Sequence, residues 1–339
     1  MVDGVEQVKG ERLGEFDIIA RYFAPLATAT GALGLRDDTA VLRPPEGQEI
    51  VLSCDTIVEG VHFLKDDPPD SIGHKALAVN LSDLAAKGAR PYVYLLALSL
   101  PSEPTSSWLE AFASGLRGLQ ERVGIVLVGG DTTASPGPLS LTVTVLGLVP
   151  QGHAVLRLGA KASDRLYVSG TIGDAYLGLR LRKDPALART LGFSEEDTAF
   201  VIDRYRRPQP RNDLALLVRN FAQAAIDVSD GLVGDIEKLA QVSHVGALIE
   251  ASRVPLSPAA RKAVELQPEL LEALMTAGDD YEIVAAVPET SANYFEAEAL
   301  GKRLSVTMIG RIEGLGGEAR VLGPDGNALK LGRKGFAHF

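Results

Sequence analysis

Short apolar segments alternate with segments of helical periodicity along the whole chain, and this alternation constrains the fold more than any other feature of the 339 residues. Continuous apolar runs bounded by Gly or Pro predict buried strands, whereas apolar residues three or four positions apart predict helices. Pro150-Gln151-Gly152 interrupts the series and predicts a domain boundary. We therefore predict a mixed α/β (α+β) fold with two domains, residues 1–150 and 151–339.

The same patterns predict individual elements in both halves. In the first half they predict helices at Gly14–Leu26, Ser71–Lys87 and Ser107–Val123, and strands at Thr39–Leu42, Ile50–Ser53, Tyr92–Leu100, Ile125–Val128 and Leu139–Val149. In the second half they predict strands at Arg165–Ser169, Ala224–Val228, Ala247–Ala251, Tyr281–Val287 and Val306–Ile312, with helices at Asp174–Leu181, Glu195–Tyr205, Leu214–Phe221, Gly231–Val242 and Ala292–Leu300.

The charge and cysteine content exclude several classes of protein. Asp and Glu total 44 against 34 Lys and Arg, a net charge of −10, so we expect neither a nucleic-acid nor a membrane partner. The single cysteine, Cys54, excludes an intramolecular disulfide and a multi-cysteine metal site. Residues 1–6 lack the features of a signal peptide, and the longest apolar run, Tyr92–Leu100, is too short to span a membrane. We expect a soluble, cytoplasmic protein.

Acidic residues recur beside Gly, Ser or Thr where predicted strands end. Each is by itself most simply a turn residue or a helix N-cap, but five such sites are harder to explain that way. Strand ends converge in α/β folds, and carboxylates gathered there would repel one another unless cations lay among them. Hard oxygen ligands favour Mg²⁺, which bridges carboxylates and substrate phosphates. An acidic protein can therefore hold an anionic nucleotide through magnesium. The sites are Asp37-Asp38, Asp55, Asp83, Asp131 and the pair Asp227 and Asp230.

Several common nucleotide and hydrolase signatures are missing from the sequence. It contains no Gly-x-x-x-x-Gly-Lys-[Ser/Thr] loop, no protein-kinase His-Arg-Asp or Asp-Phe-Gly segment, no Gly-x-Ser-x-Gly elbow and no His-Glu-x-x-His helix. A nucleotide enzyme with this sequence must therefore use a different scaffold.

A series of motifs, in order along the chain, resembles the thiamine-monophosphate kinase family, within the superfamily of aminoimidazole ribonucleotide and selenophosphate synthetases. The resemblance runs from about residue 14 to the last residue. The segments Asp55–Phe63, Asn80–Ala86 and Gly335–Phe339 make it specific to the kinases rather than to the superfamily at large. The motifs are Gly14–Phe16, Asp37–Leu42, Asp55–Phe63, Lys75–Ala89, Gly129–Thr133, Ile226–Leu232, Asp280–Glu282 and Gly335–Phe339.

This resemblance implies ATP-dependent phosphorylation of thiamine monophosphate to thiamine diphosphate. It also implies a homodimer in which the N-terminal domains, which bind ATP and Mg²⁺, pair through a shared β-barrel, each carrying a C-terminal α/β domain. By matching position, the resemblance implies that Mg²⁺ is held by Asp38, Ser53, Cys54, Asp55, Asp83, Asp131, Asp227 and Asp230. It implies ATP contacts from Gly130, Asp131, Arg157 and Ser229, and thiamine monophosphate contacts from His62, Asp279 and Phe336.

Four positions depart from the family pattern. Arg36 replaces a Gly, and Ala134 replaces an Arg that would offer a phosphate contact. Cys54 replaces a Thr, which preserves a metal ligand only if the backbone carbonyl is the donor. Asp279 replaces a Glu and is one methylene shorter. These departures leave the metal-binding Asp residues intact.

Structural roles compete with the functional ones for several residues. His62, Phe336 and Arg157 could serve packing or surface pairing, and Cys54 is more simply a small buried residue than a nucleophile. Lys87, four residues after Asp83, could form a helical salt bridge, and Lys75 lies on the same predicted helix. Three arginines could form a phosphate patch or an interdomain salt-bridge cluster: Arg206, Arg207 and Arg211.

Phosphoryl transfer requires positioning and charge neutralisation more than covalent chemistry. An acceptor phosphate oxygen is already anionic at pH 7, so we assign no general base. Two alternatives stay open from the sequence: a ring-closing ATP-dependent synthetase of the same superfamily, and a catalytically silent nucleotide-binding protein.

Overall fold

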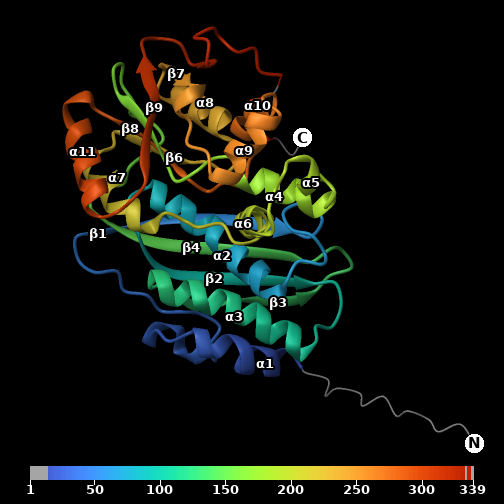
Figure 1. Cartoon of the computed structure of the whole chain (residues 1–339). Coiled ribbons are helices and arrows are strands. Elements are labelled where there is room, and N and C mark those ends of the chain that lie inside the picture. The colour runs from blue at the N-terminus through green and yellow to red at the C-terminus, as the bar shows by residue number, and fades with distance from the viewer. Residues whose placement is uncertain (1–13, 333, 337–339) are drawn as a thin grey trace, which may run out of the picture.

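The computed structural model describes residues 14–332 and 334–336, in which the chain forms two β-sheets with helices packed against them (Figure 1). The signal-peptide prediction for residues 1–6, and the last three residues of the Gly335–Phe339 motif, lie outside the described residues. In the described part of the chain, no helix is long and apolar enough to cross a membrane.

The first sheet comes from the N-terminal half of the chain. Its strands are β1 (Gln48–Val58), β2 (Arg90–Leu100), β3 (Val126–Ala134) and β4 (Ser140–Pro150), in the order β1-β4-β2-β3. Strand β4 pairs antiparallel with β1 and β2, whereas β2 and β3 are parallel. This order places β1 and β3 at opposite edges of an open sheet, and no closed barrel forms within the described chain.

Helices α2 (Pro69–Ala86) and α3 (Ser106–Val123) cover one face of this sheet (Figure 1). Thr105 caps α3 by accepting a hydrogen bond from the Trp108 amide, and Gly124 ends the helix with φ of 73°. Helix α2 has no separate polar face and is almost wholly buried, because the sheet covers one side and the second half of the chain covers the other. Its polar side chains are therefore held in fixed positions.

The opposite face of the first sheet is only partly covered in the described chain: residues 27–42 pack on Val93, Val128 and Leu146, and they leave the β1 side of this face uncovered. On β1 the alternate residues Ile50, Leu52, Cys54 and Thr56 are all exposed, and Leu52 is 67% exposed. Leu95 on β2 is 38% exposed. Apolar side chains gathered on one sheet face are typical of a surface that another molecule covers.

The second sheet comes from the C-terminal half and has the order β10-β7-β9-β5-β8-β6. Residues alternate across it: Val168, Ile226 and Val284 pack with α8, while Tyr167 and Ala285 pack with α7 and α11 on the other face. The strands are β5 (Arg165–Ser169), β6 (Ala224–Asp227), β7 (Gly246–Glu250), β8 (Ile283–Val287), β9 (Val306–Glu313) and β10 (Ala319–Leu322). The helices are α4 (Asp174–Lys183), α5 (Leu187–Thr190), α6 (Glu195–Arg206), α7 (Ala215–Phe221), α8 (Leu232–Val242), α9 (Pro258–Leu266), α10 (Leu270–Thr276) and α11 (Glu289–Gly301).

The N-terminal segment differs from the predicted continuous helix. A short α1 (Glu15–Ile18) continues into a π-helical turn at Ile19–Phe23 and a 3₁₀ turn at Ala24–Leu26, where Pro25 cannot extend an α-helix. A further 3₁₀ segment follows at Thr30–Leu35, and the predicted strand Thr39–Leu42 is irregular. The remaining short 3₁₀ turns are Asn212–Leu214 and Ala251–Arg253.

Ion pairs join the two halves of the chain. Asp67, which is buried, accepts from the Arg206 guanidinium at 2.7 Å, and Asp70 accepts from Arg207 at 2.5 Å. For these two arginines, the structure contains the interdomain salt bridges that the sequence offered as one alternative to a phosphate patch.

Candidate active site

A cavity of about 750 Å³ lies where α2 and β1 of the first half meet the strand and loop ends of the second half. Its volume lies within the range of small-molecule sites. Nine of the predicted site residues line it: Asp55, His62, Asp83, Arg157, Asp227, Ser229, Asp230, Asp279 and Phe336.

Asp55 and Asp83 form the carboxylate pair on the N-terminal side of the cavity. The Asn80 side-chain oxygen accepts the Asp55 amide hydrogen at 2.9 Å, and Ser53 Oγ donates to Asp83 at 2.5 Å. Partial burial and the neighbouring Asp83 carboxylate raise the pKa of Asp55 to about 6. The helix and the strand thus hold two like charges together, an arrangement that a cation would stabilise.

Asp227 and Asp230 approach from the C-terminal side, at the end of β6 and in the loop that follows. Burial, and then the Asp83 charge, raise the pKa of Asp227 well above its ordinary value. The Asp235 carboxylate accepts the Asp230 amide hydrogen at 2.9 Å, and Lys238 is ion-paired with both Asp230 and Asp235. Sequence reasoning missed Asp235 and Lys238, although both lie in the helix that follows the Asp227–Asp230 motif.

The donors in this cavity suit a hard cation. In the described part of the chain, no group of three or more His, Cys, Asp or Glu side chains is arranged to hold a metal ion by itself. Magnesium, however, commonly keeps several waters and takes one or two carboxylates together with substrate phosphates. Four carboxylates on facing walls of one cavity fit that mode of binding.

Lys87 lies behind the carboxylates rather than in a surface salt bridge. Its Nζ donates to the Ala225 carbonyl at 2.8 Å, across the boundary between the two halves of the chain. Burial, and then the nearby Arg157 charge, lower the pKa of Lys87 to about 8. Lys87 therefore joins α2 to β6 close to Asp227.

His62, Asp279 and Phe336 line the same cavity. His62 Nδ1 accepts the Val58 amide hydrogen at 3.0 Å, so the neutral ring carries its proton on Nε2, which can donate. The Phe336 amide donates to the Asp230 carbonyl at 2.8 Å, which holds Phe336 against the loop that follows β6. The ring of Phe336 is 48% exposed and lines the cavity.

Other predicted site residues lie elsewhere within the chain. Gly130 and Asp131 are on β3, three interstrand spacings, or about 14 Å, from the β1 edge. Asp38 is exposed in an irregular segment and does not line the cavity. Cys54 Sγ accepts from Thr144 on the uncovered sheet face, whereas Ser53 contacts Asp83 on the other face. Of Cys54, only the backbone could therefore contribute to a cation site shared with the carboxylates.

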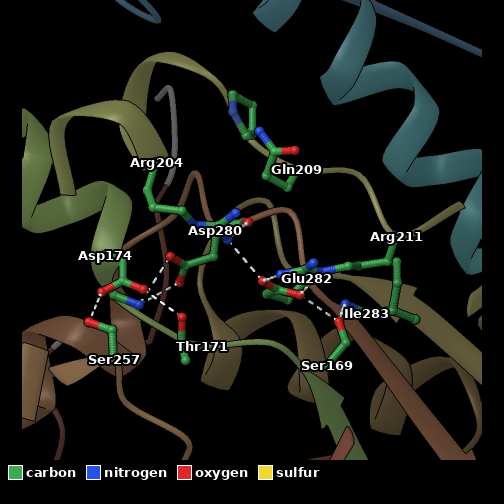
Figure 2. A network of polar contacts seen from close by, with 12 residues as sticks. Ser169, Thr171, Asp174, Arg204, Gln209, Arg211, Ser257, Asp280, Glu282 and Ile283 are labelled. Atoms are coloured by element: carbon green, nitrogen blue, oxygen red, sulfur yellow. Dashed lines mark hydrogen bonds and ion pairs between the residues drawn. The ribbon is translucent and has the colours of Figure 1, made fainter. Parts of the chain in front are cut away.

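A network of polar contacts holds Asp280 and Glu282, which follow Asp279 in the chain (Figure 2). Glu282 accepts hydrogen bonds from Arg204 at 2.9 Å, from Arg211 at 2.5 and 2.6 Å, and from Ser169 at 2.6 Å. Asp280 accepts from the Gly173 amide at 2.9 Å. The Asp280–Glu282 motif thus anchors the loop that carries Asp279, and Arg211 belongs to this network rather than to a phosphate patch.

We expect Glu282→Ala to destabilise the protein by about 3–5 kcal/mol, because it leaves the buried Arg204 guanidinium and the partly buried Arg211 guanidinium without their carboxylate. Chemical denaturation measures the change. The matched control is Glu289→Ala, which breaks an exposed pair with Arg165 and should cost less than about 1 kcal/mol. Equal losses in the two variants would contradict a structural role for the Glu282 network.

Comparisons with known proteins identify the family to which this fold belongs. Residues 36–149 match the family "AIR synthase related protein, N-terminal domain" and residues 161–322 match "AIR synthase related protein, C-terminal domain". The two halves of the chain are thus those of an AIR synthase related protein. The chain belongs to the thiamine-monophosphate kinase family within that class.

Three similar proteins illustrate the relationship. The thiamine-monophosphate kinase of Caulobacter vibrioides is 43% identical over 94% of this chain and 90% of its own. The crystal structure of thiamine-monophosphate kinase from Stenotrophomonas maltophilia K279a has a TM-score of 0.78 and 41% identity, covering 87% of this chain and 91% of its own. A structure described as "AaThiL complexed with AMPPCP and TMP" has a TM-score of 0.75 and 33% identity, covering 89% and 91%.

Proposed function

We propose that this protein is a thiamine-monophosphate kinase, which transfers the γ-phosphoryl group of ATP to thiamine monophosphate and forms thiamine diphosphate. The observation that carries the proposal is one cavity lined both by four carboxylates and by His62, Asp279 and Phe336. A relative of the same fold has been solved with AMPPCP, an ATP analogue, and TMP. Incubation with ATP, Mg²⁺ and thiamine monophosphate, followed by chromatographic detection of thiamine diphosphate, tests the proposal directly.

The arrangement suits phosphoryl transfer without a general base. The attacking oxygen belongs to a phosphate that is already anionic, so the protein needs to align two phosphates and balance their charge. Asp55, Asp83, Asp227 and Asp230 would hold Mg²⁺, which neutralises phosphate charge when it is bound. Arg157 and Ser229 line the same cavity and would contact ATP. His62 and Phe336 would contact the acceptor, and Phe336 offers it a flat aromatic face.

We propose a division of labour at the boundary near residue 150. Residues 1–150 would form the domain for ATP and Mg²⁺ binding and dimerisation, and residues 151–339 the C-terminal α/β domain. The uncovered sheet face with Ile50, Leu52 and Leu95 supports dimerisation through this domain, because pairing of two such sheets into a shared β-barrel would bury these side chains. The reaction, a step of thiamine diphosphate biosynthesis, would take place in the cytoplasm.

The homodimer would also complete the site. Strands β1 and β3 are the two edge strands of the N-terminal sheet, so barrel closure by twofold symmetry would place β3 of one protomer beside β1 of its partner. Gly130 and Asp131 of one protomer would then lie beside Asp55 of the other. This arrangement accounts for their separation within one chain.

Activity should require a divalent metal ion. We expect excess EDTA to abolish formation of thiamine diphosphate and added Mg²⁺ to restore it, since four carboxylates and the phosphates of ATP cannot share one cavity without cations. Product formation is measured before and after the addition. Full activity in excess EDTA would refute a metal role for these carboxylates.

His62→Ala and Phe336→Ala should raise the KM for thiamine monophosphate and leave the KM for ATP nearly unchanged. Loss of the Phe336 ring removes a stacking or cation–π contact of about 1 kcal/mol, or about fivefold in KM. Steady-state kinetics with each substrate varied in turn measures the effect. Tyr294→Ala, at a 71% exposed aromatic on α11, is the control and should change neither value. A similar rise in both KM values would indicate a packing role for the C-terminal segment.

A further inference from the structure

Lys75, in the N-terminal half of α2, is a cation that is only 1% exposed. Its Nζ donates to the His62 carbonyl oxygen at 2.8 Å and to Asp279 Oδ2 at 2.9 Å. The ammonium also lies 4.2 Å from the centroid of the Tyr205 ring on α6. The two oxygen atoms thus belong to His62 and Asp279, which both line the cavity and come from different halves of the chain.

The loop that carries Asp279 has a conformation that its own sequence does not favour. Asp279 and Tyr281 have φ values of 76° and 52°, in the left-handed region that is costly for residues with a Cβ. A Cβ on Gly278 would come within 2.2 Å of the Ser229 carbonyl oxygen, so this position requires glycine. Contacts with the rest of the protein must therefore hold the loop in place.

Three such contacts reach Asp279 itself. Its amide donates to the Ser229 carbonyl at 2.9 Å, and the Tyr281 hydroxyl donates to Oδ1 at 3.1 Å. Lys75 holds the other carboxylate oxygen and is the only one of the three groups that carries an opposite charge. The Asp279 side chain is 25% exposed, so one side of this restrained carboxylate still faces the cavity.

We infer that Lys75 is a positioning residue for the acceptor substrate, because its ammonium fixes the Asp279 carboxylate and the His62 segment relative to each other. This inference rests on the proposed function for the identity of the acceptor. Asp83 lies eight residues further along the same helix, about 12 Å along its axis. Helix α2 thereby sets the distance between the groups that Lys75 holds and Asp83, one of the carboxylates that would hold the metal.

The ion pair with Lys75 also fixes how the Asp279 carboxylate faces the cavity, where it can accept hydrogen bonds from a substrate amino group or face a cationic ring. Asp279 is a short side chain, so it cannot adjust its reach as a longer carboxylate would. Its usefulness therefore depends on the group that holds it.

The test compares Lys75→Met, Asp279→Asn and the double variant. We expect Lys75→Met to raise the KM and the calorimetric Kd for thiamine monophosphate about tenfold or more, with the KM for ATP changed less than about twofold. In the Asp279→Asn background, the same Lys75→Met change should raise them only about threefold or less, because the carboxylate that Lys75 positions is already absent and only its contact with the His62 carbonyl remains. If Lys75→Met does not purify as a folded protein, Lys75→Gln replaces it with the same expected split between substrates.

Two results would overturn the inference: an equal rise in the KM for ATP and for thiamine monophosphate, or an equal effect of Lys75→Met with and without Asp279. Either would leave Lys75 as a residue that only stabilises the fold. The wild-type protein separates this failure from failure of the proposed function. If it forms no thiamine diphosphate, the kinase proposal fails, while calorimetry with thiamine monophosphate alone still tests the role of Lys75.

Discussion

Asp83→Asn is expected to lower kcat/KM by at least about two orders of magnitude, or about 3 kcal/mol of transition-state stabilisation. Asp83 lies between the carboxylates of the two halves of the chain: it is close enough to Asp55 and Asp227 to raise the pKa of both. Removing its charge would weaken the shared cation site at its centre. Steady-state kinetics at saturating Mg²⁺ measures the loss.

The Asp83→Asn protein should remain folded. The amide oxygen of Asn can still accept the hydrogen bond from Ser53 Oγ, and one like charge is removed from a repulsive cluster. The matched control is Asp70→Asn on the same helix, where the carboxylate pairs with Arg207 at a half-exposed position away from the cavity. Near-wild-type turnover of Asp83→Asn, or an equal loss in Asp70→Asn, would refute the catalytic role.

The elements most visible in the sequence were those with strong periodicity and clear ends. The helix predicted at Ser107–Val123 is α3 (Ser106–Val123), and the strand predicted at Tyr92–Leu100 lies within β2. The predicted N-terminal helix Gly14–Leu26 is helical but changes from α to π and 3₁₀ turns, since Pro25 cannot extend an α-helix. The predicted strand Thr39–Leu42 was wrong, because this segment is irregular. β10 was missed because its four residues give too short a pattern.

The candidate site was predictable as a set of residue types but not as an arrangement. Acidic residues at predicted strand ends indicated a shared carboxylate site, and Asp55, Asp83, Asp227 and Asp230 do line one cavity. The predicted positions differ in part, because β1 continues through Asp55 and Asp83 lies on α2. The sequence could not indicate that Lys75 and Lys87 point from α2 into the second half of the chain, since either could equally be a solvated helix residue. Nor could local pattern indicate strand order, which places Asp131 and Asp55 on opposite sheet edges.

Strand order leads to the second large effect that we expect. Asp55→Asn and Asp131→Asn should each be nearly inactive as homodimers if both carboxylates serve every site. If each site takes Asp55 from one protomer and Asp131 from its partner, a mixed dimer of the two variants contains one site with both changes and one with neither. We therefore expect mixed dimers to recover about half of the wild-type activity. Two affinity tags on co-expressed chains allow the mixed dimer to be purified and assayed.

The control for this experiment is a mixed dimer of Asp55→Asn and Asp83→Asn. These two carboxylates lie in the same cavity of one chain, joined through the β1–α2 contact, so both sites of that dimer carry one change and activity should not return. Recovery in the first mixed dimer but not in the second would place β3 of one protomer at the site of the other. If neither recovers, or if the protein is monomeric by light scattering while active, the edge strands do not meet across a dimer. Asp131 would then have no route to the cavity, because about 14 Å of sheet separates its strand from β1 within one chain.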